Sequence, residues 1–285
     1  MDWPKIKTIL IFVLIVTNIL LGYSYNKEKI RFQVEQEDNL QDVIKLYASK
    51  GVEIKAKKLE FDSEIRSVNV SFDAYDVSHV DLLLGNEYQF DGNIYVTGDQ
   101  FVSLTDSSIL YGKEAHKDRI VLDHEASFRL AKDVKNTEKE MYIEKAQQFI
   151  KEHGFDTLKG DHEVLELGNY RLVKMTQSFD GVKFQESKTM VWFFEEEVVG
   201  FKRENIINIS DTAGTKYDII SIDKVLYGLL PKLNEGDVIE SISIIYKLND
   251  ESLLVTDLVI GEALPYYRIV TKSREEYHIR AVVSL

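Results

Sequence analysis

The side chains best suited to catalysis or metal binding in this sequence are the six histidines: His79, His116, His124, His153, His162 and His278. No two of them stand three or four positions apart, the spacing at which a helix brings two imidazoles onto one metal ion. Two lie in Asp-His-Glu triplets, at 123–125 and 161–163, but adjacent side chains do not point at one ion without outside help. We therefore interpret both triplets as solvated turns.

Three consecutive glutamates, Glu195 to Glu197, could hold a proton or a hard cation. They stand between two apolar stretches, where a hairpin must turn in water, so we interpret them as a structural turn. The preceding stretch, Trp192 to Phe194, is typical of a core strand. One of its three aromatic side chains must face the opposite side of the strand, where it is a candidate contact residue.

The absence of cysteine excludes disulfides, thiolate nucleophiles and thiolate metal sites. The sequence also contains no HExxH, GxSxG, GxGxxG or phosphate-loop motif. We therefore predict no catalytic residue, no cofactor and no metal, and a protein that is not an enzyme. An enzyme acting on wall polymers is an alternative, in which two dispersed carboxylates would lie roughly 5–10 Å apart in a groove.

Residues 6–25 form an apolar stretch in which Lys7 is the only charge. At about 1.5 Å per residue, a helix of this length matches the roughly 30 Å hydrocarbon core of a bilayer. Trp3, Lys5 and Lys7 suit the membrane interface, which favours residues 1–5 in the cytoplasm and the rest of the chain outside. The sequence therefore predicts a single-pass protein of the cell membrane.

One face of this span is a candidate contact with another helix. Asn18 shares the face with Ile11, Leu14 and Gly22, and an amide inside lipid gains from a partner on a neighbouring helix. An amide near the outer boundary that reaches water is the alternative interpretation. Gly22 and Ser24 also form a small-x-small pair, so a cleaved signal peptide is an alternative to the anchor.

The exported part is strongly acidic. The whole chain has a net charge of −13, and removing Asp2, Lys5 and Lys7 leaves 33 basic and 47 acidic residues, a net charge of −14. Such a surface repels phosphate backbones, so we exclude nucleic acid as a partner. With 44% hydrophobic residues, the chain has enough apolar area to build cores without disulfides.

Residue periodicity predicts an α+β class, with helices packed on antiparallel sheets. Helical spacing predicts four exported helices, at about 39–50, 77–84, 137–153 and 223–230, the first three closed by glycine. Alternating patterns predict strands between them, including strands around 68–72, 101–104, 109–111, 119–122, 170–179, 188–194, 238–248, 253–260 and 266–271. Tight turns are predicted at Asp91-Gly92 and Asp180-Gly181.

The order of elements divides the exported part into two predicted domains. A juxtamembrane segment covers 26–36, the first domain 37–135 and the second 136–285, which begins at the capping box of Thr137 and Glu140. The order of helix followed by sheet recurs within the second domain, which suggests a duplicated unit.

The layout of the chain resembles the YycI family, auxiliary membrane proteins of the Gram-positive WalK/WalR cell-wall signalling system. The resemblance rests on Asp2, Trp3, Lys5, Lys7 and Thr8 at the start and on Pro265, Tyr267, Arg268, Tyr277 and Ala281 near the end. Tyr267 replaces the tryptophan expected in the family. The resemblance implies a non-enzymatic regulator of a WalK-like sensor histidine kinase, a YycH-like partner protein, and exported sheet-plus-helix units like those of YycH.

A second reading keeps the exported domain but gives the span no signalling role. In that reading the chain is a PepSY-like or cystatin-like binding or inhibitor domain, and the span is a tether or is cleaved. Exchanging the span for an unrelated one separates the two readings, because only the first requires specific contacts within lipid.

Overall fold

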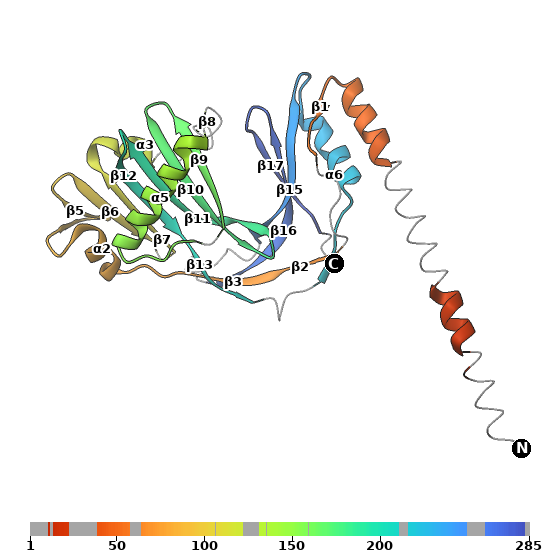
Figure 1. The fold of residues 1–285 in the computed structure, drawn as a ribbon, viewed down its shortest axis with the longest axis horizontal. Coiled ribbons are helices and arrows are strands. Elements are labelled where there is room, and N and C mark those ends of the chain that lie inside the picture. Colours follow the sequence, from red (N-terminus) through yellow and green to blue (C-terminus); the bar gives the residue numbers. More distant parts are fainter. Residues whose placement is uncertain are drawn as a thin grey trace, which may run out of the picture. The chain divides into compact units, whose positions relative to one another are not determined.

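The computed structural model describes residue 11 and the ranges 14–22, 39–57, 64–105, 107–121, 131–134, 136–158, 160–210, 216–249 and 260–282. The chain divides into two compact units (Figure 1). The first contains the described residues up to Ile54 together with Ser221–Asp237, and the second contains Lys55–Ile220 and Val238–Leu285. The sequence predicts a boundary between two independently folding domains after residue 135, and that boundary stays a prediction.

Two helices build the first unit. The helix over 39–49 buries Tyr47 and half-buries Val43 and Ile44, the predicted apolar spacing, and Gly51 follows at φ +75°. The second helix, α6 (Ile222–Leu229), continues into the short 3-10 helix η2 (Leu230–Lys232), and β1 (Glu53–Ile54) belongs to the same unit. The buried side of α6 consists of Ile222, Val225, Leu226 and Leu229.

The second unit begins with short strands and helices. The strands are β2 (Glu64–Arg66), β3 (Val68–Phe72), β4 (Gln89–Asp91), β5 (Ile94–Thr97), β6 (Gln100–Thr105) and β7 (Ser108–Lys113). The helical segments are α2 (Val77–Leu84), η1 (Glu114–His116) and α3 (Lys117–Val121). As predicted, Asp76 caps α2, because its Oδ1 accepts from the Ser78 amide at 3.0 Å, and Gly85 closes the helix at φ +74°.

A long helix and an antiparallel meander follow. They are β8 (Lys132–Asp133), α5 (Asn136–Glu152), β9 (Gly160–Leu167), β10 (Tyr170–Phe179), β11 (Val182–Phe194) and β12 (Glu197–Glu204). Gly154 follows α5 at φ +73°, as predicted. Asp180 and Gly181 both have positive φ, which confirms the predicted tight turn between β10 and β11. The Thr137 side chain of the predicted capping box lies outside the described residues.

The last strands are β13 (Ile206–Ser210), β14 (Lys216–Asp218), β15 (Val238–Leu248), β16 (Ile260–Thr271) and β17 (Glu276–Arg280). The predicted strand at 253–260 lies outside the described residues except for Ile260.

The main sheet runs in the order β13-β3-β16-β15-β11-β12-β7-β6-β5-β4. Along this order the strands pair antiparallel except where β11 meets β15, through Lys183 opposite Ile245 and Phe184 opposite Tyr246. The first residues of β11 therefore pair with β15, and its last residues pair with β12. β10 pairs with β11 along its opposite edge. The structure thus confirms a mixed α+β class dominated by antiparallel strands.

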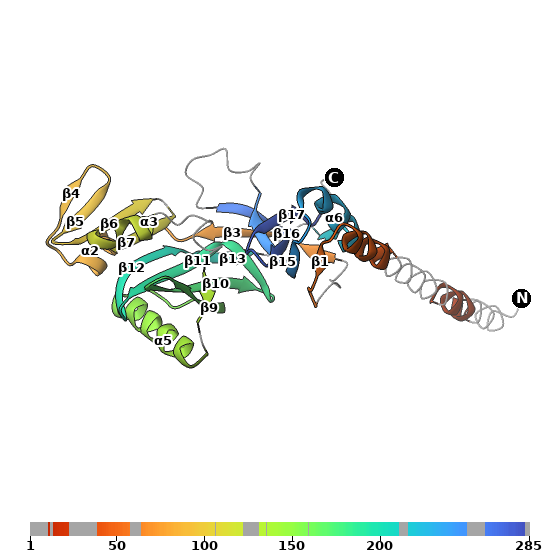
Figure 2. The ribbon, with the colours of Figure 1, turned by 90° about the horizontal axis from the view of Figure 1, so that it is seen from above.

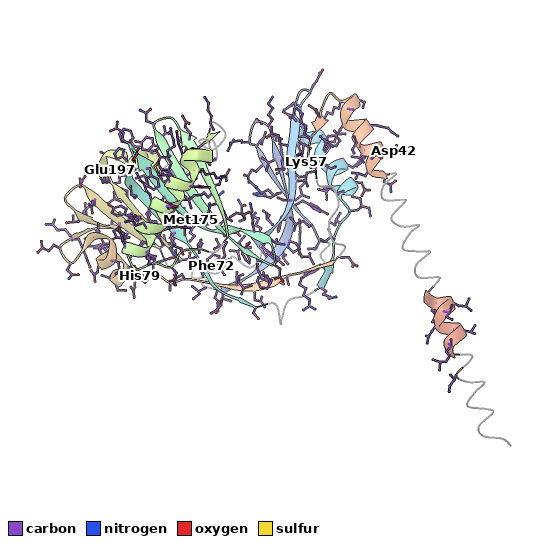
Figure 3. All side chains as sticks on the ribbon, in the orientation of Figure 1. Asp42, Lys57, Phe72, His79, Met175 and Glu197 are labelled. Carbon is purple, nitrogen blue, oxygen red and sulfur yellow. The ribbon has the colours of Figure 1, made fainter. Side chains whose placement is uncertain are left out.

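Both faces of the β9–β12 region are buried. On one face lies α5 (Figure 2), whose Ala146 and Ile150 pack with Val173 and other sheet residues. Met175, labelled in Figure 3, belongs to the same cluster. On the other, Ile120 of α3 packs with Leu172, Met190 and Trp192. Burial on both faces explains why β11 reads as a nearly continuous apolar run.

Two local predictions are wrong. In the predicted strand at 119–122, residues 119–121 belong to α3, and residue 122 lies outside the described residues. Ile120 packs from a helical turn against Gly112 and Gly200, and this tertiary packing overrides the β-propensity of Ile and Val. The predicted Asp91-Gly92 turn lies one residue later, since Asp91 pairs with Ile94 within the ladder and leaves Gly92 and Asn93 to turn.

The described N-terminal residues, 11 and 14–22, are helical, and the apolar side chains among them are exposed. No helix within the described ranges combines the length and the hydropathy needed to cross a bilayer. The rest of the predicted span over 6–25 lies outside those ranges.

Candidate functional site

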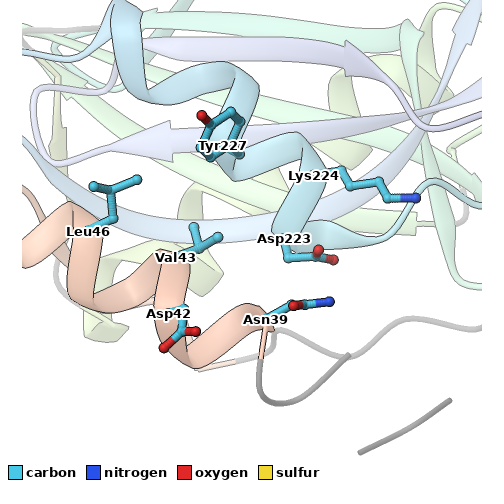
Figure 4. A pocket seen from close by; sticks show the side chains of 7 residues that line it. All are labelled: Asn39, Asp42, Val43, Leu46, Asp223, Lys224 and Tyr227. Carbon is cyan, nitrogen blue, oxygen red and sulfur yellow. The ribbon is translucent and has the colours of Figure 1, made fainter. Parts of the chain in front are cut away.

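An open groove lies between the two helices of the first unit (Figure 4). It has a volume of about 440 Å³. The helix over 39–49 contributes Asn39, Asp42, Val43 and Leu46, and α6 contributes Asp223, Lys224 and Tyr227. In Figure 4, Val43 and Leu46 line one helix opposite Tyr227, whereas Asn39, Asp223 and Lys224 lie at the other end.

Buried contacts beneath this groove hold its two helices together. Tyr47 is fully buried, and its hydroxyl donates to the Leu226 carbonyl at 2.7 Å. Burial raises the pKa of Tyr47, so the phenol stays protonated and keeps donating. At the helix ends, the Lys50 ammonium donates to the carbonyls of Leu230 at 2.6 Å and Leu233 at 3.0 Å. A cation placed on C-terminal carbonyls is favourable for both hydrogen bonding and the helix dipole.

The lining combines exposed apolar area with charge. Tyr227 is 66% exposed and Leu46 is 39% exposed, although both belong to helices that bury their other faces. Asp42 forms an exposed ion pair with Lys45 at 2.9 Å. On the other helix, α6, the charged lining residues are Asp223 and Lys224. No lining side chain is a nucleophile next to a base. This composition suits recognition of an amphipathic segment better than it suits catalysis.

A second cluster of charges lies within the second unit. Arg268 donates to both carboxylate oxygens of Glu276, at 2.9 Å through Nε and more closely through Nη2. His278 Nε2 lies 3.3 Å from Glu276 Oε2. Burial raises the pKa of Glu276, but hydrogen bonding to Arg268 and His278 outweighs burial and holds the pKa well below its usual range.

This cluster extends from β16 and β17 to β9 and β10. Arg274 Nη1 lies 3.9 Å from Glu163 Oε1, and Lys174 stands opposite Glu163 in the β9–β10 ladder. Burial, and then the like charge of Lys188, lowers the pKa of Lys174. The carboxylates are therefore engaged with cations, an arrangement typical of a structural ion-pair network.

The four predicted contact residues of the span lie in the described helical segments. Leu14, Asn18 and Gly22 follow one another at intervals of four residues in the helix over 14–22, so they share a face, and all three are exposed. Ile11 is helical and 58% exposed. The predicted interface residues Trp3, Lys5 and Lys7 lie outside the described residues.

His79, His116 and His153 each have a polar partner, whereas the buried Nε2 of His162 has no hydrogen-bond partner within the described residues. His116 Nδ1 lies 2.8 Å from the Tyr170 hydroxyl, and His153 Nδ1 lies 2.8 Å from the Phe149 carbonyl. Within the described ranges, no three His, Asp or Glu side chains gather as a metal site would require. The triplet at 123–125 lies outside those ranges.

The triplet at 161–163 is part of β9, so its interpretation as a turn is wrong. Strand alternation places His162 on the opposite face from Asp161 and Glu163. The two carboxylates have different cationic partners, Lys183 at 2.6 Å for Asp161 and Arg274 at 3.9 Å for Glu163.

The glutamate run is a turn, as predicted. Glu195 and Glu196 form the two-residue connection between β11 and β12, with φ of 48° and 71°, and Glu196 pairs with Lys145 of α5 at 2.7 Å. Phe193 faces the opposite side from Trp192 and Phe194, but it is 1% exposed, packs with α5 and belongs to the core. It is therefore not a contact residue of an exposed surface.

Sequence reasoning missed the groove residues on α6. The predicted helix from Asp223 was correct, but its exposed side received no role. The available signal was Tyr227, a large aromatic residue on the polar side of a helix whose other face holds Val225, Leu226 and Leu229.

No protein-family model matches the chain. No curated protein matches it either. Among solved structures, the chain is similar to the crystal structure of YycH from Bacillus subtilis, with a TM-score of 0.46 and 12% identity over 79% of this chain. It spans 55% of the length of that YycH chain. It is also similar to the YpeB C-terminal domain of Bacillus megaterium, with a TM-score of 0.29 and 16% identity, covering 73% of this chain and 90% of that domain. Similarity of this degree assigns no function.

Proposed function

We propose that the chain is a membrane-anchored, non-enzymatic regulatory protein that modulates a WalK-like sensor histidine kinase together with a YycH-like protein. The observation that carries the proposal is the N-terminal helical segment. Its large apolar residues, including Leu14, Ile19 and Leu21, are 39–65% exposed. Water does not favour so much exposed apolar area on one helix, whereas lipid or another apolar helix does.

The groove of the first unit supports a role in recognition near the membrane. Sixteen residues separate Gly22 from Asn39, and even a fully extended chain of that length reaches no more than about 60 Å. A partner that enters the groove must therefore present a segment close to the bilayer surface. The exported stretch that directly follows a membrane span of a sensor kinase meets this condition.

The regulatory step follows from differential binding. A sensor kinase exchanges between arrangements of different activity, and a bound protein shifts that exchange only if it prefers one arrangement. Two surfaces of this chain would bind one kinase arrangement more tightly than the other. They are the face of Leu14, Asn18 and Gly22 within lipid, and the groove outside the membrane. Resemblance to the YycI family supplies the identity of the kinase.

Span exchange tests the proposal in cells that contain the kinase and the YycH-like protein. Replacing residues 6–25 by an unrelated span of equal length should abolish both co-purification with the kinase and the effect on kinase phosphorylation. A tether-only binding domain would keep its effect after the exchange. That outcome would overturn the proposal in favour of the PepSY-like or cystatin-like alternative.

A single substitution tests the contact face. Asn18→Leu should weaken co-purification severalfold, because it removes the amide that hydrogen-bonds across the helix pair. Thr17→Leu is the matched control, since it also removes a polar group but lies roughly 100° around the helix. Equal behaviour of the two variants would reject the Asn18 face.

A further inference from the structure

The outer edge of the main sheet is open. β4 ends the strand order and pairs with β5 alone among the described strands (Figure 2). Its three residues, Gln89, Phe90 and Asp91, are all exposed. Proteins protect such edges with very short strands, charged side chains, proline or a bulge. β4 is three residues long and carries Asp91, but it has no lysine or proline, and its register with β5 is regular.

The exposed edge carries an ordered aromatic group. Phe90 is 62% exposed, and its ring lies 4.9 Å from the Tyr95 ring, which lies 5.4 Å from the Tyr88 ring. Tyr88 is fixed from below, because its hydroxyl donates to Asp81 of α2 at 2.8 Å. A preformed aromatic surface loses little side-chain entropy on association.

Strand geometry selects the residue at which a new strand would pair. Asp91 and Ile94 flank the two-residue turn, so they form the narrow, hydrogen-bonded position of the hairpin. Backbone groups alternate along an antiparallel strand, and the amide and carbonyl of Phe90 therefore point away from β5. An added antiparallel strand must be centred on Phe90.

The sequence around this centre is complementary to itself. In an antiparallel pair of two copies centred on Phe90, Asp91 of each copy faces Gln89 of the other. Just beyond the strand ends, Glu87 would face Asn93. Each carboxylate thus meets an amide, and no like charges stand opposite each other, which a chain of net charge −13 requires for self-association.

We propose that β4 is a homodimerisation edge, at which two copies of this chain join their sheets antiparallel about a twofold axis at Phe90. The contact is isologous, as a twofold interface must be. The strand is short, so the interface is smaller than that of a permanent dimer and the association is transient. The proposal does not depend on the proposed regulatory function, because it concerns a surface in the second unit alone.

Cross-linking tests the register, and the cysteine-free chain makes the test specific. Phe90→Cys places the two thiols on the axis, within the Cα–Cα range of a disulfide. Gln89→Cys is the matched control: its two copies lie about two residues apart along the strands, beyond roughly 7 Å. Mild oxidation of each full-length variant in membranes, followed by non-reducing electrophoresis, should give at least tenfold more dimer for Phe90→Cys. Equal yields, or no dimer from Phe90→Cys, would overturn the proposal.

Phe90→Cys also removes the aromatic ring of the proposed contact, so a second measurement uses the unmodified chain. The weight-average mass of the wild-type protein in detergent should rise with concentration, and Phe90→Lys should remain monomeric. Because Phe90 is exposed, the lysine variant should keep the wild-type circular dichroism spectrum. A wild-type mass that does not change with concentration, or a Phe90→Lys variant that associates as the wild type does, would overturn the homodimer. If the chain stays monomeric and another protein binds at β4, the edge is a binding site for that protein and the homodimer is likewise overturned.

Discussion

The β9–β12 region and the helix pair of the first unit use opposite means to hold their elements. The sheet is covered on both faces, by α5 on one and by α3 on the other, and Trp192, Val191 and Phe193 are at most 2% exposed. The helix pair buries Tyr47, Leu226 and Leu229 but leaves an open groove between its two helices.

This difference separates a rigid scaffold from a surface able to adapt. Close-packed interiors respond to a lost side chain with a large loss of stability. Few buried contacts permit local opening at low cost, and binding surfaces are drawn from such regions. We therefore expect substitutions in the sheet to lower global stability and substitutions in the groove to alter recognition.

Truncation of Trp192 should give the largest effect. Trp192→Ala removes a buried indole from the face that packs on α3, and we expect a loss of about 3–5 kcal/mol in the free energy of unfolding. Urea denaturation followed by circular dichroism measures it, and Trp192→Phe, which keeps an aromatic ring but removes part of the volume, should lose less stability. A loss below 1 kcal/mol would mean that this side of the sheet is loosely packed.

Glu276→Gln should have the next largest effect and a defined pH dependence. It removes the charge that accepts both Arg268 bonds, for an expected loss of about 1–3 kcal/mol at neutral pH, since both side chains are partly solvated. The folded-state pKa of Glu276 is lowered from 4.5, so its stabilisation is complete above that pH and is lost as the pH falls through the lowered value. Acid titration of stability should therefore be shallower in Glu276→Gln than in the wild type; parallel curves would contradict the ion pair.

Tyr47→Phe should destabilise the helix pair by about 1 kcal/mol. The substitution keeps the ring but removes one of the two hydrogen bonds to the Leu226 carbonyl, which still accepts from the Leu230 amide. Hydrogen exchange should accelerate in the helix over 39–49 and in α6, while amides of β10 and β11 keep their protection. Uniform acceleration across both units would show that the two regions unfold together.

Tyr227→Ala should have the smallest effect on stability, within about 0.5 kcal/mol, because the side chain is 66% exposed. Its expected consequence is functional: weaker co-purification with the kinase. Tyr217→Ala, a half-buried tyrosine of β14 outside the groove lining, is the control. If both variants bind the kinase as the wild type does, the groove is not the recognition site.

The elements with strong local signals were predictable from the sequence. Helix periodicity with a closing glycine placed the helix over 39–49, α2 and α5, and turn chemistry placed Asp180-Gly181. Alternation placed β3, whose burial repeats every second residue. In these segments, local propensity and tertiary packing favour the same conformation.

The remainder depended on contacts that a linear pattern does not contain. The apolar stretch at 119–122 has strand propensity, but α3 forms there because of residues 80 positions away. The groove joins residues near 40 with residues near 225, and no motif relates them. Exposed aromatic residues such as Tyr227 and Phe90 were the one local signal for surfaces, and that signal is readable only once the buried face of each element is known.

Gly112 and Gly200 stand opposite each other on β7 and β12, and a Cβ at either position would come within 2.9 Å of the Ile120 side chain. Because neither glycine has a side chain, the Ile120 side chain packs directly against the backbone of both strands. Natural variants of this chain should therefore change these positions together, with alanine at 200 tolerated where residue 120 becomes smaller. Correlated substitution at these three positions would show that they pack together where β7 pairs with β12.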